Sequence, residues 1–405
     1  MILPDTCDDL LCSCMTPREL FRYSLTCRDG RRAVTSYRQR AYNLKKTMGR
    51  FMSGDEVDRF QLLQSETGTV ISGSVALQYL GRYDFTASDL DIYTEHRYAE
   101  QVCDFLVGLG YHYQPRTNQH LSFTAQLTRD EVQGAHLGGF MMPGAYSSNS
   151  MCGAYNFVKP NNDDVVIQLI TARIAVMDII LDFHSTVVMN VITHRNAYSL
   201  YPYETFEERR ALTARKTPAR REQVAFAKYR ERGWRIRSSV NASEAFDPTQ
   251  EFSEGTRRVG DEMTWVLPLD QTGRHGALAI DTLPGNSWYL IYLERFLSDS
   301  GREMRSYAKM MRQRVVLEGD EWRQAYTFAT DAHYTAFRAE IQRIQPDESR
   351  QTDADVVCAV EASYRKIIVT NEDDESDDDF SVILQAVSDY ERHIFRRYSN
   401  VDEAE

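Results

Sequence analysis

A glycine-serine pair and two aspartates one residue apart are the residues of this sequence best suited to chemistry. Gly73 and Ser74 follow a short apolar run, and Asp89 and Asp91 come a short helix later. A glycine lets an anion approach the backbone, and the free amides that open a helix favour a phosphate. On a strand, Asp89 and Asp91 project from one face, where paired carboxylates can bind Mg²⁺ together with substrate phosphates. The pattern predicts a phosphate cradle beside a cation site, as metal-assisted nucleotidyl or phosphoryl transfer requires.

Each half of this pattern also has a plain structural explanation. Ser74 can be a helix cap, and the two aspartates can be the solvated end of a strand. Neither half is specific alone. The joint pattern, an apolar run, Gly-Ser, a helix and Ser-Asp-Leu-Asp-Ile-Tyr, is far more specific and favours the site.

The surrounding elements must bring the turn and the aspartates together. A turn and a short buried strand are expected within 67–74, and "GAYNFVKPNNDDVVIQLI" predicts a hairpin with a Pro-Asn-Asn-Asp turn. Residues 115–150, rich in Gly, Ser, Asn and Met, are expected to be a loop with short strands. Amphipathic spacing predicts helices at the following positions: 56–66, 96–110, 174–182 and 185–197.

The joint pattern resembles the nucleotidyltransferase fold of the DNA polymerase beta type, whose signature is a Gly-Ser or Gly-Gly turn followed by an Asp-x-Asp strand. More narrowly, the chain is similar to a group of fungal proteins with this fold. These proteins pair "GSxALQ…SDLDIY" with later segments, found here as "IQLI" at 167–170, "FHSTVVMN" at 183–190 and "AYSLYP" at 197–202. The resemblance covers about residues 50–205. It implies an α/β (α+β) fold, with a mixed sheet flanked by helices.

The resemblance also implies an activity and a set of site residues. Gly73 and Ser74 would hold the phosphates of an NTP, while Asp89 and Asp91 would hold Mg²⁺ or Mn²⁺ for transfer of a nucleotidyl group to an unknown acceptor. Active members of the wider fold add a third carboxylate on a neighbouring strand. Gln168 stands at that position here, and an amide cannot act as a base. Catalytic competence and a degenerate, non-catalytic scaffold both stay open.

Four further polar residues lie in the segment that follows. His184 is either a hydrogen-bonded core histidine or a catalytic one, and the first reading is favoured. Ser185, with Thr186 beside it, most simply caps the next helix. Asn190 either touches a nucleotide base or satisfies a buried carbonyl.

The first fifty residues resemble an F-box, a small helical module that docks onto the adaptor Skp1 of a ubiquitin ligase. The resemblance rests on Leu3-Pro4, on Leu10 and Leu11, and on "TPRELFRYSLTCRDGRRAV" at 16–34. It implies an alternative function, a non-catalytic adaptor that recruits targets to the ligase. The same apolar positions also suit a plain helical cap. Thr16, Pro17 and Glu19 predict a capped helix start.

Composition and charge limit the remaining possibilities. The chain has 405 residues, of which 42% are apolar, as in a globular protein. Its net charge of -12 argues against a protein whose whole surface is built to bind nucleic acid. The basic stretch 207–237 could contact phosphate backbones, but interleaved glutamates and three aromatics favour a solvated helical face. No secretory signal or membrane span is expected, and seven cysteines without zinc spacing suggest reduced thiols in the cytoplasm or nucleus.

The sequence divides into four predicted parts. These are a helical module at 1–50, a nucleotidyltransferase-like domain at 51–205, a mixed α+β region at 206–345, and an acidic linker with a terminal helix at 346–405. Strands are expected within 262–281, long helices within 287–345, and a disordered acidic segment at 371–380.

Overall fold

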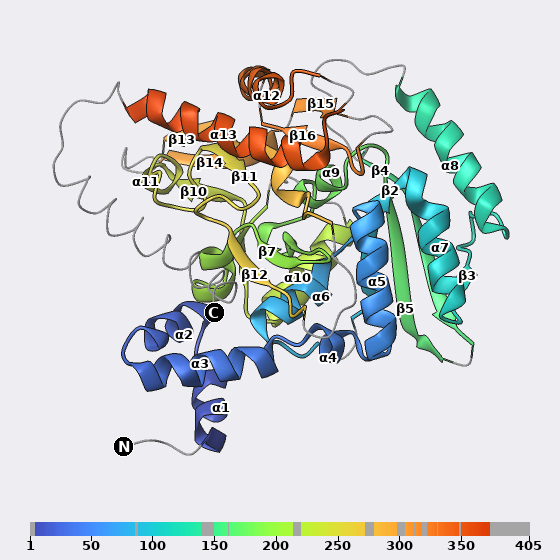
Figure 1. Ribbon diagram of the computed structural model, residues 1–405, viewed down its shortest axis with the longest axis horizontal. Coiled ribbons are helices and arrows are strands. Elements are labelled where there is room, and N and C mark those ends of the chain that lie inside the picture. The colour runs from blue at the N-terminus through green and yellow to red at the C-terminus, as the bar shows by residue number, and fades with distance from the viewer. Residues whose placement is uncertain are drawn as a thin grey trace.

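An eight-stranded mixed sheet flanked by helices lies at the centre of the computed structural model (Figure 1), so the predicted α+β class is confirmed. In spatial order its strands are β12 (Trp265–Pro268), β7 (Asn196–Ser199), β6 (Asn190–Ile192), β1 (Val70–Ser72), β2 (Leu90–Glu95), β5 (Asn162–Ala172), β4 (Met151–Lys159) and β3 (His112–Gln114). Neighbours β2 and β5 run parallel, and the other neighbouring pairs run antiparallel. The structure describes residues 5–85, 88–138, 150–160, 162–213, 220–271, 279–297, 304–311, 313–317, 322–329, 331–347 and 350–372.

The two faces of this sheet carry separate apolar cores, because successive residues of a strand point to opposite faces. Ile92 and Leu169 pack on one face with the helices α5 (Gly54–Thr67), α6 (Gly73–Gly81) and α7 (Ala99–Gly108). Tyr93 and Ile170 pack on the other face with α9 (Val176–Leu181) and with Trp288 of β13. Asp91 belongs to this second face, on which the candidate site lies.

Two predictions near the sheet are wrong. Residues 123–138, expected to be loop, form helix α8 (Phe123–Gly138), which buries Gln126 and Leu127. Residues 185–197, expected to be one helix, form a short 3-10 turn (Thr186–Val188) and the β6–β7 hairpin. The β-branched residues of "STVVMNVIT" favour strands once a sheet edge is available to pair with them.

The C-terminal region combines a second sheet and a pair of strands with helices. β10 (Ser239–Asn241), β14 (Met304–Met311), β13 (Ser287–Leu297) and β11 (Gly255–Arg258) form a second sheet, and β15 (Gln313–Leu317) pairs with β16 (Tyr326–Phe328). The long helices expected at 287–345 are therefore wrong, apart from α12 (Asp331–Ile344). Packed against α12 is α13 (Asp353–Glu372). The expected strand "ALAI" is wrong at Ala279 and Ile280, which lie outside any strand, and its first two residues fall outside the described residues.

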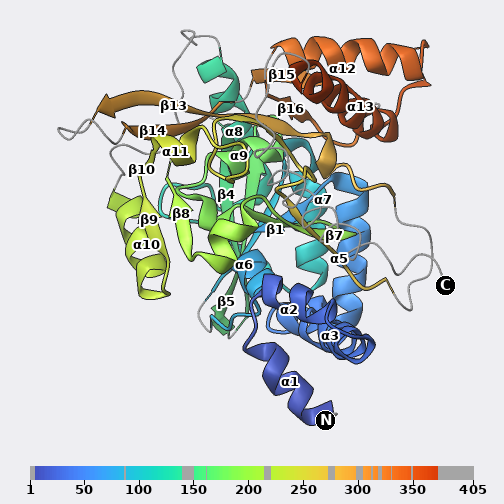
Figure 2. The same ribbon diagram turned by 90° about the vertical axis from the view of Figure 1, so that its left-hand side faces the viewer.

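The N-terminal helices lie at one end of the molecule and α12 and α13 at the other, as both views show (Figures 1 and 2). The N-terminal helices are α1 (Asp5–Ser13), α2 (Pro17–Ser24), α3 (Arg28–Ala41) and α4 (Leu44–Met48). The predicted capping box is present, since the Glu19 amide donates to Thr16 Oγ1 at 3.2 Å and the Thr16 amide donates to a Glu19 carboxylate oxygen at 2.8 Å. The core of this module is formed by Cys12, Leu20, Val34 and Tyr37.

Arg82 joins the N-terminal module to the helix that follows Gly73. Its Nη1 donates to the Cys12 carbonyl at 3.1 Å and to the Tyr37 hydroxyl at 2.9 Å, and its guanidinium lies over the Tyr42 ring. We expect Arg82→Ala to lower the free energy of unfolding by about 2 kcal/mol, because charged hydrogen bonds are lost and two buried acceptors stay unpaired. Amide hydrogen exchange should quicken in α1 and α3 first. Arg82→Lys, which keeps the positive charge, is the comparison. Unchanged protection of the α1 and α3 amides in Arg82→Ala would contradict the role of Arg82 in joining the module to α6.

Among the described residues, no helix is both long and apolar enough to cross a membrane. The boundaries proposed for the four parts stay predictions, although β12 from the third part completes the edge of the sheet in the second. Much of the acidic stretch at 371–380 and all of the terminal helix expected at 381–397 lie outside the described residues.

Candidate active site

The glycine turn and the second aspartate touch each other. Strand β1 ends at Ser72, which pairs with Asp91 across the antiparallel β1–β2 ladder, and α6 begins at Gly73. Gly73 has a φ of +71°, and a Cβ built on it would stand 2.6 Å from Asp91 Oδ2. Only glycine suits this position, because a side chain would face a strained backbone and a carboxylate at once. The Gly-Ser turn and the second aspartate of the predicted pair are therefore neighbours in space.

The two predicted carboxylates differ in their surroundings. Strand β2 begins at Leu90, so Asp89 precedes the strand instead of lying on it, and its side chain is exposed. Asp91 is partly buried. Burial, followed by the negative charge of Asp89, raises the pKa of Asp91 to about 7, and Lys228 opposes this shift. Neither carboxylate accepts a hydrogen bond or forms an ion pair within the described part of the chain.

Helix α10 (Arg220–Glu231) brings positive charge to these carboxylates. Lys228 lies within electrostatic range of both carboxylates. Burial and the positive charge of Arg232 lower the pKa of Lys228, whereas the negative charges of Asp91 and Asp89 raise it. Arg232, just beyond the helix, places its Cζ 3.8 Å from the Phe85 ring centroid. Its Nη1 is buried and makes no hydrogen bond with the residues that the structure describes.

Neither Lys228 nor Arg232 is singled out by the sequence pattern. The basic stretch 207–237 is expected to be a solvated face anchored by three aromatics, and these aromatics, Phe226, Tyr229 and Trp234, are buried. The sequence signal that could have indicated them is the spacing of Lys228 and Arg232, two cations four residues apart next to the aromatic Tyr229. The closeness of Lys228 to the carboxylates depends on tertiary packing, which the local pattern does not carry.

Ser74 is the second residue of α6, and the helix cap is Ser72. The Ser72 hydroxyl donates to the Asn190 carbonyl at 2.6 Å, which ties the turn to β6. The reading of Ser74 as the cap is therefore wrong. Its hydroxyl makes no hydrogen bond with a described residue, which leaves it available to a ligand near the turn.

Gln168 stands directly beside Asp91, as expected for the third position of the site. The two residues pair in the parallel β2–β5 ladder, so their side chains share a face. Gln168 Nε2 donates to Asn156 Oδ1 on β4 at 3.1 Å. Within the described ranges, no group of three or more His, Cys, Asp or Glu side chains could hold a metal ion. Any cation here would have two carboxylates and neutral oxygens as ligands.

His184 packs in an aromatic environment next to α10. Its ring lies 5.5 Å from the Phe226 ring and 5.6 Å from the Tyr229 ring, and its Nδ1 pairs with Ser185 Oγ at 2.8 Å. Ser185 therefore occupies the N-cap position of the short 3-10 turn, but its hydroxyl pairs with the histidine and not with the backbone of that turn. Asn190 lies on β6 rather than on a helix, and its Nδ2 donates to the Val187 carbonyl at 2.9 Å, which supports its structural reading.

His184 gives a pH-dependence prediction. Burial lowers its pKa from 6.5 to about 4, so the unfolded chain binds a proton more readily between these pH values. Stability from this residue is present above pH 6.5 and is lost as the pH falls toward 4. We expect His184→Gln to flatten the fall in unfolding free energy between pH 6.5 and pH 4, measured by denaturant titration. A parallel fall in both proteins would contradict burial of the neutral imidazole.

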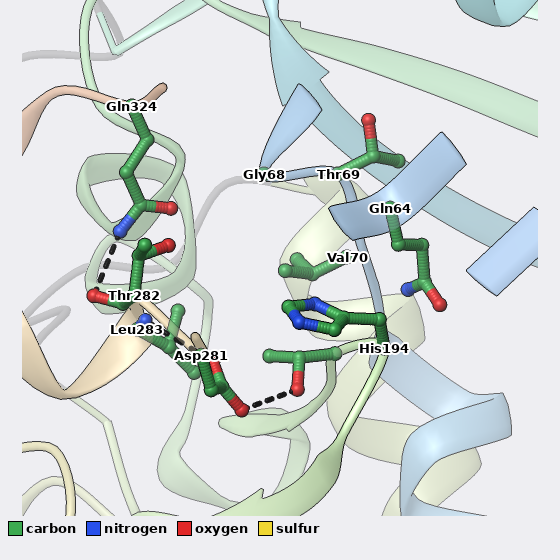
Figure 3. Close-up of a pocket in the computed structure, with 10 residues that line it drawn as sticks. Gln64, Gly68, Thr69, Val70, His194, Asp281, Thr282, Leu283 and Gln324 are labelled. Carbon is green, nitrogen blue, oxygen red and sulfur yellow. Dashed lines mark hydrogen bonds between the residues drawn. The ribbon is translucent and has the colours of Figure 1, made fainter. Parts of the chain in front are cut away.

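A separate small pocket opens at the other end of β1, near Gly68 (Figure 3). Its volume of about 10 Å³ suits one water molecule and excludes a nucleotide. Asp281 at its wall accepts hydrogen bonds from Thr193 Oγ1 at 2.6 Å and from the Tyr198 hydroxyl at 2.8 Å. This carboxylate therefore fastens the 279–283 segment to the β6–β7 hairpin.

Comparison with family models, with curated proteins and with solved structures finds no match to this chain. Its function must therefore be inferred from its own residues.

Proposed function

We propose that this protein binds a nucleoside triphosphate with a divalent cation and transfers the nucleotidyl group to an acceptor. The observation that supports the proposal is the close approach of the left-handed Gly73 to Asp91, which brings the Gly-Ser turn beside one of the two carboxylates. The resemblance to nucleotidyltransferases of the DNA polymerase beta type was found in the same residues, and it agrees with this arrangement.

The residues present fit a divalent cation. Asp91 combines partial burial with a like charge from Asp89, and the described residues offer its oxygens no hydrogen-bond donor. Such a carboxylate gains stability from a cation. Asp89 and Asp91 would hold Mg²⁺ or Mn²⁺, which would supply charge neutralisation at the phosphates.

The anion side of the site is supported by three groups of this chain. Ser74 offers a hydroxyl, Lys228 brings a positive charge within electrostatic range of both carboxylates, and Arg232, which acts on Lys228, has a buried Nη1 without a hydrogen bond to a described residue. A buried guanidinium nitrogen without a partner is costly unless a ligand satisfies it. Phosphate oxygens of a triphosphate suit both the charge and the donors.

In the proposed reaction an acceptor hydroxyl attacks the α-phosphorus, an oxygen–phosphorus bond forms, and pyrophosphate leaves with the electrons of the broken bond. The hydroxyl proton must pass to a base. Gln168 cannot accept it, so we expect slow transfer unless the acceptor brings its own base.

Incubation with ATP, GTP, CTP and UTP labelled at the α-phosphate, with Mg²⁺ or Mn²⁺, tests this proposal. Label should enter a product with the wild type and not with Asp89→Ala/Asp91→Ala. Gln168→Glu should raise the rate, since it restores a carboxylate beside Asp91. Transfer that survives the double change would rule out the proposed site.

A non-catalytic adaptor that binds Skp1 is the second candidate. It is favoured by the exposure of Leu10 (71%) and Leu25 (47%) on the N-terminal module. If the module docks there, Leu10→Ser/Leu25→Ser in the full chain should abolish retention of purified Skp1. Leu62→Ser, which changes a leucine 52% exposed on α5, should leave retention unchanged. Absence of Skp1 binding by the wild type would remove this candidate.

A further inference from the structure

A polar row crosses the sheet beside the carboxylates. Asp91 on β2 pairs with Gln168 on β5, which pairs with Asn156 on β4. Beyond Asn156, the Arg116 guanidinium donates from Nη2 to Asn156 Oδ1 at 3.1 Å. The loop that carries Arg116 is held to the same strand, because Gln119 Nε2 donates to the Ala154 carbonyl at 3.0 Å.

Arg116 fixes the orientation of both amides in this row. A guanidinium only donates hydrogen bonds, so Asn156 must present its oxygen to Arg116. The same oxygen lies 3.1 Å from the terminal amide of Gln168, which must therefore donate through Nε2. The amide oxygen of Gln168 is left without a hydrogen bond from any described residue, in a side chain placed between Asn156 and Asp91.

We propose that Gln168 Oε1 is a third, neutral oxygen ligand of the cation held by Asp89 and Asp91, and that Asn156 and Arg116 are positioning residues that turn this oxygen toward the site. The inference rests on the proposed function. It gives the amide at the third position a binding role, although the amide cannot serve as a base. Divalent cations such as Mg²⁺ accept amide oxygens as ligands alongside carboxylates.

The sign of one mutational effect separates this proposal from simple electrostatics. Removing a positive charge near a cation site should tighten cation binding if charge alone matters. Arg116→Ala should instead weaken it, since the amides are then free to rotate. Loss of an outer partner that orients a ligand typically costs about tenfold or more in metal affinity.

The test is titration of the full-length protein with Mn²⁺ alone, followed by calorimetry or by the signal of free Mn²⁺. Arg116→Ala should raise the dissociation constant about tenfold, and Arg116→Lys, which keeps a donor, should raise it less. Arg129→Ala removes an exposed charge from α8 as a matched control and should change nothing. In a Gln168→Leu background, Arg116→Ala should have no further effect.

Each outcome decides a different point. Unchanged or tighter binding by Arg116→Ala, with binding lost in Asp91→Asn, overturns the role of Gln168 and leaves the proposed function standing. The role of Gln168 is also overturned if Arg116→Ala raises the dissociation constant for Mn²⁺ equally in the wild type and in the Gln168→Leu background. Wild-type protein that does not bind Mn²⁺, or Asp91→Asn that binds as the wild type does, overturns the proposed function itself.

Discussion

Asp91→Asn is expected to abolish nucleotidyl transfer and, at the same time, to stabilise the fold. The rate of nucleotidyl transfer should fall by at least about 10³-fold, because the asparagine amide carries no negative charge with which to hold the divalent cation at the phosphates. In the presence of EDTA at pH 8, the free energy of unfolding should rise by on the order of 2 kcal/mol. A functional carboxylate often costs stability in this way.

The sign of the stability change follows from the pKa of Asp91. Burial and Asp89 raise this pKa from 3.8 to about 7, so the folded protein resists ionisation that the unfolded chain undergoes. The wild type therefore loses stability as the pH rises from about 4 to 7, and asparagine removes that loss. Asp104→Asn, an exposed change on α7, should alter neither rate nor stability. A fully active Asp91→Asn would contradict the site.

Gly73→Ala is expected to disrupt both the turn and the site. The backbone at this position has a φ of +71°, which costs a residue with a Cβ about 1–2 kcal/mol. The new Cβ would also stand 2.6 Å from Asp91 Oδ2, so the carboxylate or the turn must move. We expect the free energy of unfolding to fall by about 3 kcal/mol and nucleotide binding to be lost.

Gly108→Ala is the matched comparison for this change. Gly108 ends α7, and a Cβ built there meets no atom within 4 Å. Alanine should leave stability unchanged or raise it by up to about 1 kcal/mol, since it favours helix more than glycine does. Chemical denaturation of both variants provides the measurement. A Gly73→Ala protein as stable as Gly108→Ala would be incompatible with the left-handed turn.

Within the segment from α5 to β2, the helix, the short buried strand and the Gly-Ser turn were predicted correctly because their signals are local, whereas Asp89 was expected on β2 and precedes it. An amphipathic helix, a short apolar strand and a Gly-Ser turn each depend on neighbours in the sequence. The pairing of Ser72 with Asp91 could be expected only through a resemblance, because sequence spacing alone does not fix which strands become neighbours.

The later part of the chain was predicted less well, for a physical reason. "SWYLIYLERFL" has a continuous apolar run from Trp288 to Leu293, which fits a buried helix as easily as a strand. Its β-branched and aromatic residues form β13 because β11 and β14 lie beside it to complete the ladder. Lys228 was missed for a similar reason, since α10 reaches the aspartates only through the tertiary fold.

Nucleotide binding with and without a divalent cation tests the central claim most directly. Calorimetric titration of the full-length protein with each nucleoside triphosphate should show binding in Mg²⁺ that disappears in EDTA. The Asp89→Asn/Asp91→Asn protein should not bind under either condition, while Asp104→Asn should bind as the wild type does. Equal binding by the double variant, or wild-type binding that is indifferent to EDTA, would contradict a cation-assisted nucleotide site at Gly73 and Asp91.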